Sequence, residues 1–532
     1  DVVENSHAST SLSWADGIAR ANHLQGHEDC HVVAVIGDGA LTGGMAWEAL
    51  DNIADSSDKH LVVVVNDNGR SYAPTIGGLA HHLDALRTNP GYERMLAGVK
   101  RTLLTQGAPG RAAFDALHGL KRGLKDVLVP SAFFEDLGIK YTGPVDGHDE
   151  TALEFALTRA REYADPVIVH VITEKGRGYT PAEEDVVDRF HAVGRIHPET
   201  GLPIVPSRFG WTSVFAEEIL ELARADERIV AVTAAMQQPV GLQPMADALP
   251  DRVIDVGIAE QHALTASAGM AFAGLHPVVA LYATFLNRAF DQVLMDVGLH
   301  HAGVTIVLDR AGLTGTDGAS HNGMWDMALL AHVPGLRLAA PRDETTLRED
   351  LRTAAATSDG PTVLRYPKGA LPERAPALRV MGPPNDPFEA VDVLMEADDD
   401  GPGERRLLLV AVGAMTPAVL AAGRDLADEG RAVAVVAPRW VVPIPRALVE
   451  TARSFDGVVV VEDGLVDGGI GSQLRDALED NAAETGRRCP VVARVGVPRR
   501  FLGTASRKQL LADFGMDTEG IAATARRLLS AV

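Results

Sequence analysis

Acidic and amide side chains follow two consecutive apolar segments near the start of the chain. Asp38 stands between two glycines directly after segment 31–36, and Asn68 ends an Asn-Asp-Asn triplet directly after segment 61–65. A carboxylate and an amide carbonyl are hard oxygen ligands that suit Mg²⁺ or Ca²⁺ when a diphosphate supplies further oxygens. Glycines also let backbone N–H groups come close to phosphate oxygens. The pair therefore predicts a metal and diphosphate site, whereas Gly-Asp-Gly alone would be ordinary turn chemistry.

Glu260 is a second acidic residue at the junction of an apolar segment, 253–258, and a helical one. One interpretation is a carboxylate favoured by the helix dipole, worth about 0.3–1 kcal/mol. The other is a glutamate that hydrogen-bonds a ring nitrogen of a bound cofactor. Tyr282 and Phe285 end a later apolar segment and are either core aromatics or a stacking surface for a flat ring. Arg288 follows one helical turn beyond, as an anion anchor or as a solvated arginine.

The elements that must position these residues alternate along the chain. Short apolar segments bounded by Gly and Asp are typical of strands buried on both faces of a parallel sheet, and helical stretches separate them. The predicted fold class is therefore α/β, with doubly wound, mainly parallel sheets. Ligands bind beyond the carboxyl ends of such strands, so a right-handed crossover through a helix at about 40–54 would bring Asp38 and Asn68 side by side. Further examples of expected strands are 167–172, 229–233, 278–282, 304–308, 407–412, 432–436 and 458–461.

Two stretches rich in Pro and Gly, 195–210 and 382–406, are expected to be linkers. They predict three α/β domains, at 1–200, 207–380 and 400–532. Between 86 and 130 the strand pattern disappears, and we expect helices that either cover a sheet edge or form a mobile lid.

Composition narrows the class of protein. The chain has 532 residues, of which 46% are apolar and 23% charged, the balance of a globular protein. A net charge of −23 argues against nucleic-acid and anionic-membrane partners, and it requires local Lys and Arg to hold an anionic substrate. With only Cys30 and Cys489, we expect no disulfide framework and a reducing compartment, and no apolar run is long enough to span a membrane. The chain starts at Asp1 without Met, so we expect that an upstream segment is missing.

Further motifs identify a family. In order along the chain they are GDGALTGG, NDN, GPVDGHD, KGRGYTPAE, FHAV, DVGIAEQHA, YATFLNRAFDQ, DRAGLTGTDGASHNG and RYPKG, followed by VAVGAMTPA and VVEDGLVDGGIGS. This series resembles the 1-deoxy-D-xylulose-5-phosphate synthase family, within the transketolase-like thiamine diphosphate enzymes, over nearly the whole chain. The resemblance implies three domains of the transketolase-like type: a diphosphate-binding domain, a pyrimidine-binding domain and a carboxy-terminal domain.

The resemblance also implies roles for individual residues. Lys368 stands where the family commonly has Arg, and Ser6-His7-Ala8 stands where it commonly has Gly-His-Ser. We leave His31, His60 and His170 as structural, and we expect Asp317 one helical turn before His321. The implied metal ligands are Asp38, Asn68 and the Arg70 carbonyl; the implied catalytic residues are Glu260, His191 and His321; the implied cofactor contacts are Ser6, His7, Ala8, Gly39, Ala40, Asn68, Lys175, Tyr179, Glu260 and Phe285; and the implied substrate contacts are Tyr282, Arg288, Arg310, Asp317 and Lys368.

The implied activity is a decarboxylating condensation of pyruvate with D-glyceraldehyde 3-phosphate to 1-deoxy-D-xylulose 5-phosphate and CO₂, which feeds isoprenoid, thiamine and pyridoxal synthesis. The implied cofactors are thiamine diphosphate and Mg²⁺. A homodimer is implied, in the cytoplasm of a bacterium or the plastid stroma of a plant. One alternative is a transketolase, which would not release CO₂. The other is an inactive, interaction-only relative, suggested by the missing upstream segment.

Overall fold

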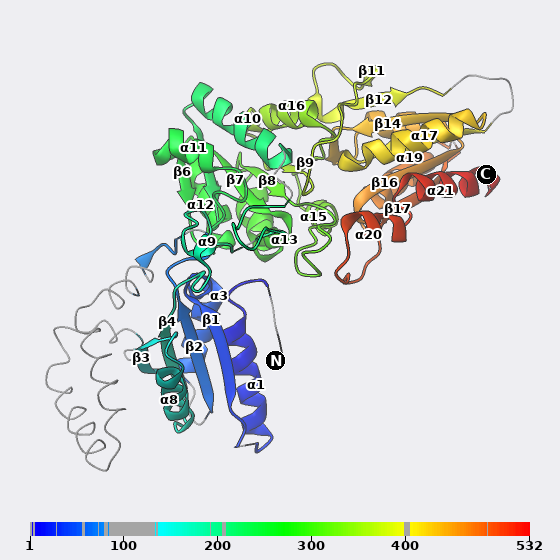
Figure 1. Cartoon of the computed structure of the whole chain (residues 1–532). Helices are drawn as coiled ribbons and strands as arrows, with labels where there is room; N and C mark the ends of the chain where they lie inside the picture. Colours follow the sequence, from blue (N-terminus) through cyan, green and yellow to red (C-terminus); the bar gives the residue numbers. More distant parts are fainter. Residues whose placement is uncertain are drawn as a thin grey trace, which may run out of the picture. The chain divides into compact units, whose positions relative to one another are not determined.

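The computed structural model, drawn in Figure 1, describes residues 3, 6–27, 29–55, 59–72, 74–78, 83, 134, 137–191, 193–204, 209–397, 405–486 and 488–531. The helical insertion expected at 86–130 lies outside these residues. The described residues divide into two compact units. Unit 1 comprises Asp1–Pro206 with Val256–Ala259, and unit 2 comprises Ser207–Asp255 with Glu260–Val532.

Unit 1 is built on a parallel sheet with the strand order β1-β2-β4-β3. The register pairs Gly37, the last residue of β1, with Asn66 near the end of β2, so these two strand tips are level. The residues that follow each strand therefore emerge at the same edge of the sheet. The strands are β1 (Val32–Gly37), β2 (Leu61–Asp67), β3 (Lys140–Asp146) and β4 (Val167–Ile172), and the helices are α1 (Ser11–Leu24), α2 (Asp38–Leu41), α3 (Gly44–Ala54), α8 (Glu150–Arg161) and α9 (Thr180–Glu183).

The connection between β1 and β2 is not the single helix that we expected at about 40–54. It consists of α2 and α3, which are separated at Thr42 and Gly43. Gly43 is extended, and a Cβ atom added to it would overlap the side chain of Ser9. Ser9 in turn donates from Oγ to the Ala40 carbonyl at 2.6 Å. The break thus lets the segment before α1 approach α2 closely.

Unit 2 contains a seven-stranded sheet with the order β15-β9-β10-β8-β7-β5-β6. Its strands are parallel except for β15, which pairs antiparallel with β9. The strands are β5 (Ile229–Thr233), β6 (Val253–Asp255), β7 (His276–Tyr282), β8 (Thr305–Asp309), β9 (Arg337–Ala339), β10 (Thr362–Arg365) and β15 (Trp440–Val442), and the helices include α10 (Trp211–Ala225), α11 (Gln243–Ala248), α12 (Glu260–Phe272), α13 (Ala283–Leu286), α15 (Asp326–Leu330) and α16 (Glu344–Ala355).

A six-stranded sheet with the order β11-β12-β14-β13-β16-β17 completes unit 2. The pairs β11–β12 and β12–β14 are antiparallel and the remaining pairs are parallel. The strands are β11 (Arg379–Met381), β12 (Val391–Met395), β13 (Arg406–Ala411), β14 (Ala432–Pro438), β16 (Gly457–Leu465) and β17 (Val491–Val497), and the helices are α17 (Thr416–Asp428), α18 (Arg446–Ala452), α19 (Ile470–Thr485), α20 (Arg507–Asp513) and α21 (Thr518–Ala531).

The segment 382–406 is not the unstructured linker that we expected. It carries β12, whose Val391 and Val393 are buried, and Asp392 of this strand binds Arg342 and Arg439. The two sheets of unit 2 are also joined by the buried guanidinium of Arg365, which binds Asp326 at 2.6 Å and Asp463 at 2.7 Å. The α/β class with mainly parallel sheets is confirmed, while the domain limits 1–200, 207–380 and 400–532 stay a prediction.

The expected strands agree with the structure except at 253–258. There β6 ends at Asp255, and Gly257, with φ of +73°, turns the chain before α12 begins at Glu260. Within the part of the chain that the structure describes, no helix has both the length and the apolar composition needed to cross a bilayer.

Candidate active site

The predicted metal ligands lie together at the carboxyl edge of the unit 1 sheet. Asp38 follows β1 and Asn68 follows β2, and the Asn68 N–H donates to Asp38 Oδ1 at 3.3 Å. Asn68 Oδ1 accepts from the Arg70 N–H at 3.3 Å, so the turn folds back on itself. The level strand tips thus bring the Asp38 carboxylate against the backbone of the turn that begins at Asn68.

Asp38 is 2% exposed, and its burial raises the pKa of its carboxyl. The hydroxyl of Thr75 donates to Asp38 Oδ2 and opposes this shift. A buried carboxylate is costly unless a cation or several donors compensate it. A carboxylate, an amide oxygen and a backbone carbonyl form a donor set that Mg²⁺ accepts when phosphate oxygens and water complete its octahedron. The residues present therefore fit this ion.

The described residues contain no cluster of three or more His, Cys, Asp or Glu that would hold a metal ion by itself. The set at Asp38 has a single carboxylate, so its affinity for a divalent ion would depend on a bound diphosphate. A cavity of about 420 Å³ adjoins the turn and offers space for such a group. Its lining residues are Asn68, Gly69, Arg70, Pro74, Ile172, Thr173, Glu174 and Arg189.

Lys175 and His191 are in direct contact in unit 1. Lys175 Nζ lies 2.6 Å from His191 Nδ1 and donates to the Ser71 carbonyl at 2.6 Å. Burial, assisted by Arg70, lowers the pKa of Lys175 to about 8. Burial and the adjacent Lys175 lower the pKa of His191, whose ring lies 4.0 Å from the Tyr72 ring between centroids. The lowered pKa of Lys175, about 8, therefore lets this ammonium group exchange a proton near neutral pH.

The remaining predicted cofactor contacts of unit 1 differ from one another in exposure and in hydrogen-bond partners. Ser6 is exposed, whereas His7 and Ala8 are half-buried, and the bond from Ser9 to Ala40 brings this stretch to α2. Tyr179 donates from its hydroxyl to the Pro198 carbonyl at 2.8 Å and packs edge-on against Phe190. The hydroxyl of Tyr179 is thus engaged within unit 1.

Glu260 in unit 2 is the first residue of α12, as the sequence predicted, and is 5% exposed. Within the described structure its buried Oε2 has no hydrogen-bond partner, and Arg288 Nη1 lies 3.9 Å away. Burial raises the pKa of the Glu260 carboxyl, while Arg288 opposes the shift. Buried polar atoms are nearly always hydrogen-bonded, so an unpaired oxygen that a ring nitrogen could satisfy fits the predicted cofactor.

Aromatic and basic residues gather at the ends of β7 and β8. Tyr282 and Phe285 stack with centroids 5.7 Å apart and an angle of 12°. The Arg310 guanidinium lies 3.8 Å from the centre of the Tyr282 ring, and the ring of His321 meets Phe285 edge-on at 5.8 Å. Arg310 has φ of +58°, an unfavourable conformation for a residue with a side chain, and such strain concentrates at functional sites.

The expectation that Asp317 lies one helical turn before His321 is wrong. Residues 311–325, all of which the structure describes, form turns and bridges without a helix. Gly312, Gly315 and Gly318 have φ of +73°, +82° and +82°, which a right-handed helix cannot accommodate. Asp317 instead binds Lys368, whose Nζ lies 2.9 Å from Oδ1 and 2.8 Å from Oδ2. His321 Nδ1 faces Ser320 Oγ at 3.0 Å.

Sequence reasoning missed Thr75 and Asp309. Thr75 reaches Asp38 because its N–H binds the Gly69 carbonyl at 3.0 Å, a loop contact without a sequence signal. Asp309 ends β8, is 1% exposed, accepts from Thr212 Oγ1 at 2.7 Å and lies 3.5 Å from Arg310 Nη1. Its place at a strand tip, directly before Arg310, was the signal that could have identified it.

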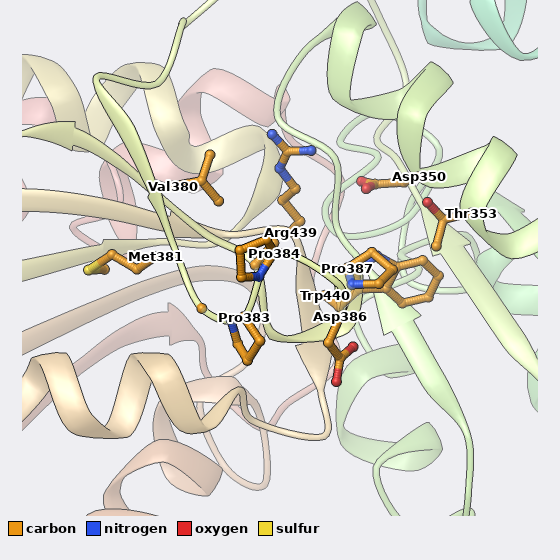
Figure 2. A pocket seen from close by; sticks show the side chains of 12 residues that line it. Asp350, Thr353, Val380, Met381, Pro383, Pro384, Asp386, Pro387, Arg439 and Trp440 are labelled. Atoms are coloured by element: carbon orange, nitrogen blue, oxygen red, sulfur yellow. The ribbon is translucent and has the colours of Figure 1, made fainter.

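Unit 2 contains another cavity, of about 320 Å³, between α16 and the segment 380–390 (Figure 2). Arg439 in its wall already binds Asp392 at 2.9 Å and Glu349 at 2.7 Å. Among its lining residues in the described structure, none is a predicted site residue, so we do not include this cavity in the candidate site.

The chain matches three protein families. Residues 1–173 match the family described as 1-deoxy-D-xylulose-5-phosphate synthase, residues 207–374 match the transketolase pyrimidine binding domain, and residues 397–521 match the transketolase C-terminal domain. The order of the matches follows the order of the three sheets along the chain.

Several bacterial proteins are similar over nearly the whole chain. The chain is 57% identical over 522 residues to 1-deoxy-D-xylulose-5-phosphate synthase 2 of Streptomyces coelicolor, covering 98% of this chain and 79% of that protein. It is 56% identical over 531 residues to the protein of the same name from Kitasatospora griseola, covering 100% and 82%. It is 55% identical over 530 residues to 1-deoxy-D-xylulose-5-phosphate synthase of Renibacterium salmoninarum, covering 98% and 79%.

A similar solved structure is described as a split gene transketolase, an inactive beta4 tetramer. It superposes with a TM-score of 0.51 at 28% identity, covering 60% of this chain and 97% of that chain. This similarity agrees with the transketolase-like arrangement of the sheets.

Proposed function

The chain belongs to the 1-deoxy-D-xylulose-5-phosphate synthase family, and we propose that the residues described above carry out that family's reaction in named roles. The reaction condenses pyruvate with D-glyceraldehyde 3-phosphate, releases CO₂ and gives 1-deoxy-D-xylulose 5-phosphate. Membership of the transketolase-like group implies thiamine diphosphate as cofactor. The assignment of roles rests on the presence of two features in this chain. One is the set of oxygen atoms at Asp38 and Asn68, and the other is the buried oxygen of Glu260 that has no partner in the described structure.

Thiamine diphosphate, when bound, supplies a nucleophilic thiazolium carbon and an electron sink for the decarboxylation. In this proposal Asp38, Asn68 Oδ1 and the Arg70 carbonyl would hold Mg²⁺ at the diphosphate end of the cofactor. The cavity beside the Asn68–Arg70 turn receives the phosphate groups. Lys175 and the stretch from Ser6 to Ala8, which reaches α2 through Ser9, complete the contacts with this end of the cofactor.

Glu260 holds a proton at the pyrimidine ring. Its raised pKa and low exposure favour a shared proton between Oε2 and a ring nitrogen over a free carboxylate. Such a bond would satisfy the oxygen that has no partner in the described structure. Phe285, half-buried beside Tyr282, offers a flat surface against the ring.

His191 and His321 move or hold protons on the substrates, since imidazoles are suited to proton transfer near neutral pH. Both substrates are anions, and a chain with net charge −23 must place cations locally to hold them. Arg310 and Lys368 bind the phosphate and carboxylate groups of the substrates. The guanidinium of Arg288 places a positive charge next to Glu260. Asp317 orients Lys368.

A homodimer and a cytoplasmic location complete the proposal, and the relatives named above are bacterial proteins. The deciding experiment feeds the chain pyruvate and D-glyceraldehyde 3-phosphate with thiamine diphosphate and Mg²⁺. It follows CO₂ release and the formation of 1-deoxy-D-xylulose 5-phosphate together. Transfer of a two-carbon unit from a ketose phosphate without CO₂ would indicate a transketolase instead, and thiamine diphosphate that fails to bind would indicate an inactive relative.

A further inference from the structure

Three polar side chains, two of them buried and one half-buried, form a chain of hydrogen bonds next to the Asn68–Arg70 turn. Asp67, at 0% exposure, ends β2, and His170, at 1%, lies on the neighbouring strand β4. His170 Nε2 is 2.9 Å from Asp67 Oδ2, and His170 Nδ1 is 2.7 Å from the hydroxyl of Tyr141 on β3. We call these residues the Asp67–His170–Tyr141 chain.

The strand register explains why these side chains meet. Asp67 pairs with Ile172 and Tyr141 pairs with Ile168, which are the residues two positions after and two positions before His170. Side chains two residues apart on a strand point to the same face. Asp67, His170 and Tyr141 therefore form one row across three strands on the same face of the sheet.

The direction of the hydrogen bonds follows from the groups involved. The Asp67 carboxylate only accepts, so His170 donates from Nε2, and Nδ1 is left to accept from the Tyr141 hydroxyl. Tyr141 is held in turn by its stacking on Phe134, at 5.8 Å between centroids and 4° between planes. Each member thus has its orientation set by the next.

The other oxygen of Asp67 reaches the turn that carries the predicted metal ligands. Asp67 Oδ1 accepts the N–H of Gly69 at 3.2 Å, and Gly69 has φ of +73°. Gly69 lies between Asn68 and Arg70, which supply two of the three proposed oxygens for Mg²⁺. The Asp67 carboxylate therefore links the sheet to the turn, beside the bond from the Asn68 N–H to Asp38.

We propose that the Asp67–His170–Tyr141 chain is a positioning network that sets the Mg²⁺ affinity of the site by fixing the Asn68–Arg70 turn. The inference rests on the proposed function, because it needs the oxygen set at Asp38 to hold a metal. None of the three residues touches the metal or the cofactor in this arrangement. Groups that orient metal ligands typically change metal affinity about 10–100-fold when they are replaced.

The test replaces His170 in two ways. In His170→Asn the shorter amide does not reach Asp67, whereas in His170→Gln an amide nitrogen can occupy nearly the place of Nε2. His276→Asn is the matched control, since His276 is also a buried strand histidine, and its Nε2 pairs with Thr305 Oγ1 at 2.8 Å in unit 2. Mg²⁺ is titrated against each variant of the 532-residue chain at fixed thiamine diphosphate, with binding followed by calorimetry and folding by circular dichroism.

We expect the half-saturating Mg²⁺ concentration to rise about 10–100-fold in His170→Asn, with a smaller rise in His170→Gln and none in His276→Asn. Saturating Mg²⁺ should restore thiamine diphosphate binding in both His170 variants. A lowered melting temperature with an unchanged Mg²⁺ midpoint would show that the network only stabilises the sheet, and would overturn the proposal.

Tyr141→Phe keeps the proposal testable if His170→Asn does not fold. It removes one hydroxyl and retains the stacking on Phe134, so we expect it to fold and to raise the Mg²⁺ midpoint several-fold. An unchanged midpoint in this variant would also overturn the proposal. If the unaltered chain shows no Mg²⁺-dependent binding of thiamine diphosphate, the proposed function itself fails, which is a different result from a failure of the network alone.

Discussion

Glu260 Oε2 lies 3.9 Å from Arg288 Nη1, so the two groups attract each other without forming a hydrogen bond. The oxygen is buried, and the described part of the chain offers it no other partner. Such an arrangement costs free energy in the protein alone, on the order of 1–3 kcal/mol for an unsatisfied buried group. The cost is recovered if a ligand donor completes the bond, which is the reason to read Glu260 as part of a binding site.

Glu260→Ala should separate binding from turnover. The variant leaves Asp38 and Asn68 intact, so Mg²⁺-dependent binding of thiamine diphosphate should stay measurable by calorimetry. Because the proton at the ring would no longer be held, we expect kcat to fall by at least about 100-fold. Glu260→Gln, which keeps the size of the side chain, serves as the control for packing. Turnover in Glu260→Ala close to that of the unaltered chain would refute the role given to Glu260.

Lys175→Gln should raise the pKa of His191. The positive charge of Lys175, 2.6 Å from the imidazole, is the second cause of the lowered pKa of His191, after burial. Removing that charge favours the protonated imidazole, so the acidic limb of the kcat/KM profile should move to higher pH. The measurement is a pH profile, supported by NMR titration of the His191 ring protons.

A control variant must remove a positive charge from the same loop without touching His191. Arg177→Gln is a suitable control, since Arg177 is exposed and pairs with Glu174 at 3.4 Å on the same loop. It should leave the pH profile unchanged. An acidic limb that does not move in Lys175→Gln, or that moves equally in both variants, would contradict the assigned coupling.

The sequence predicted the meeting of Asp38 and Asn68 because it depends only on local rules. An apolar strand, a crossover and a parallel register place the two strand tips at one edge, and the observed pairing of Gly37 with Asn66 follows that rule. The start of α12 at Glu260 was predicted on similar local grounds. The roles of these residues as metal and cofactor contacts stay predictions.

Contacts that depend on loop geometry could not be predicted from the sequence. The ion pair between Lys368 and Asp317 needs three glycines with positive φ to shape the turns of 311–325, and a helix was expected there instead. Strand β12 was missed because it lies within 382–406, whose prolines and glycines predicted a linker, and β15 was missed because it has three residues and is followed directly by a proline. Their pairing across distant segments gives them a stability that local propensity does not reveal.

Lys368→Met should weaken the binding of the phosphorylated acceptor. The ammonium group of Lys368 donates to both carboxylate oxygens of Asp317. Because an ammonium group has three N–H bonds, it retains a donor for a phosphate. We expect KM for D-glyceraldehyde 3-phosphate to rise about 10-fold, the size of one charge-assisted hydrogen bond of roughly 1.5 kcal/mol, with KM for pyruvate little changed. Lys508→Met, at an exposed position of α20, is the control and should alter neither constant. Equal increases of both KM values would indicate a general disturbance of the site instead.

Asp350→Asn should stabilise unit 2 more at high pH than at low pH. Asp350 lies on α16 beside the second cavity (Figure 2), is 2% exposed, and its Oδ2 has no partner in the described structure. Burial raises the pKa of Asp350 well above its usual value, and Arg439 and Arg342 oppose the shift. The folded state therefore binds this proton more tightly than the unfolded state, so stability falls as pH rises from the unfolded pKa, about 4, toward the folded pKa.

An amide cannot ionise, so Asp350→Asn removes this loss. We expect the variant to melt a few degrees higher than the unaltered chain at pH 8 and at nearly the same temperature at pH 4, by scanning calorimetry. Glu349→Gln is the matched control, because Glu349 neighbours Asp350 on the same helix, is partly exposed and pairs with Arg439. Its removal should change stability by less than about 1 kcal/mol at either pH. A gain at pH 8 that persists unchanged at pH 4 would mean that the amide acts through packing, and that Asp350 is not the source of the pH dependence.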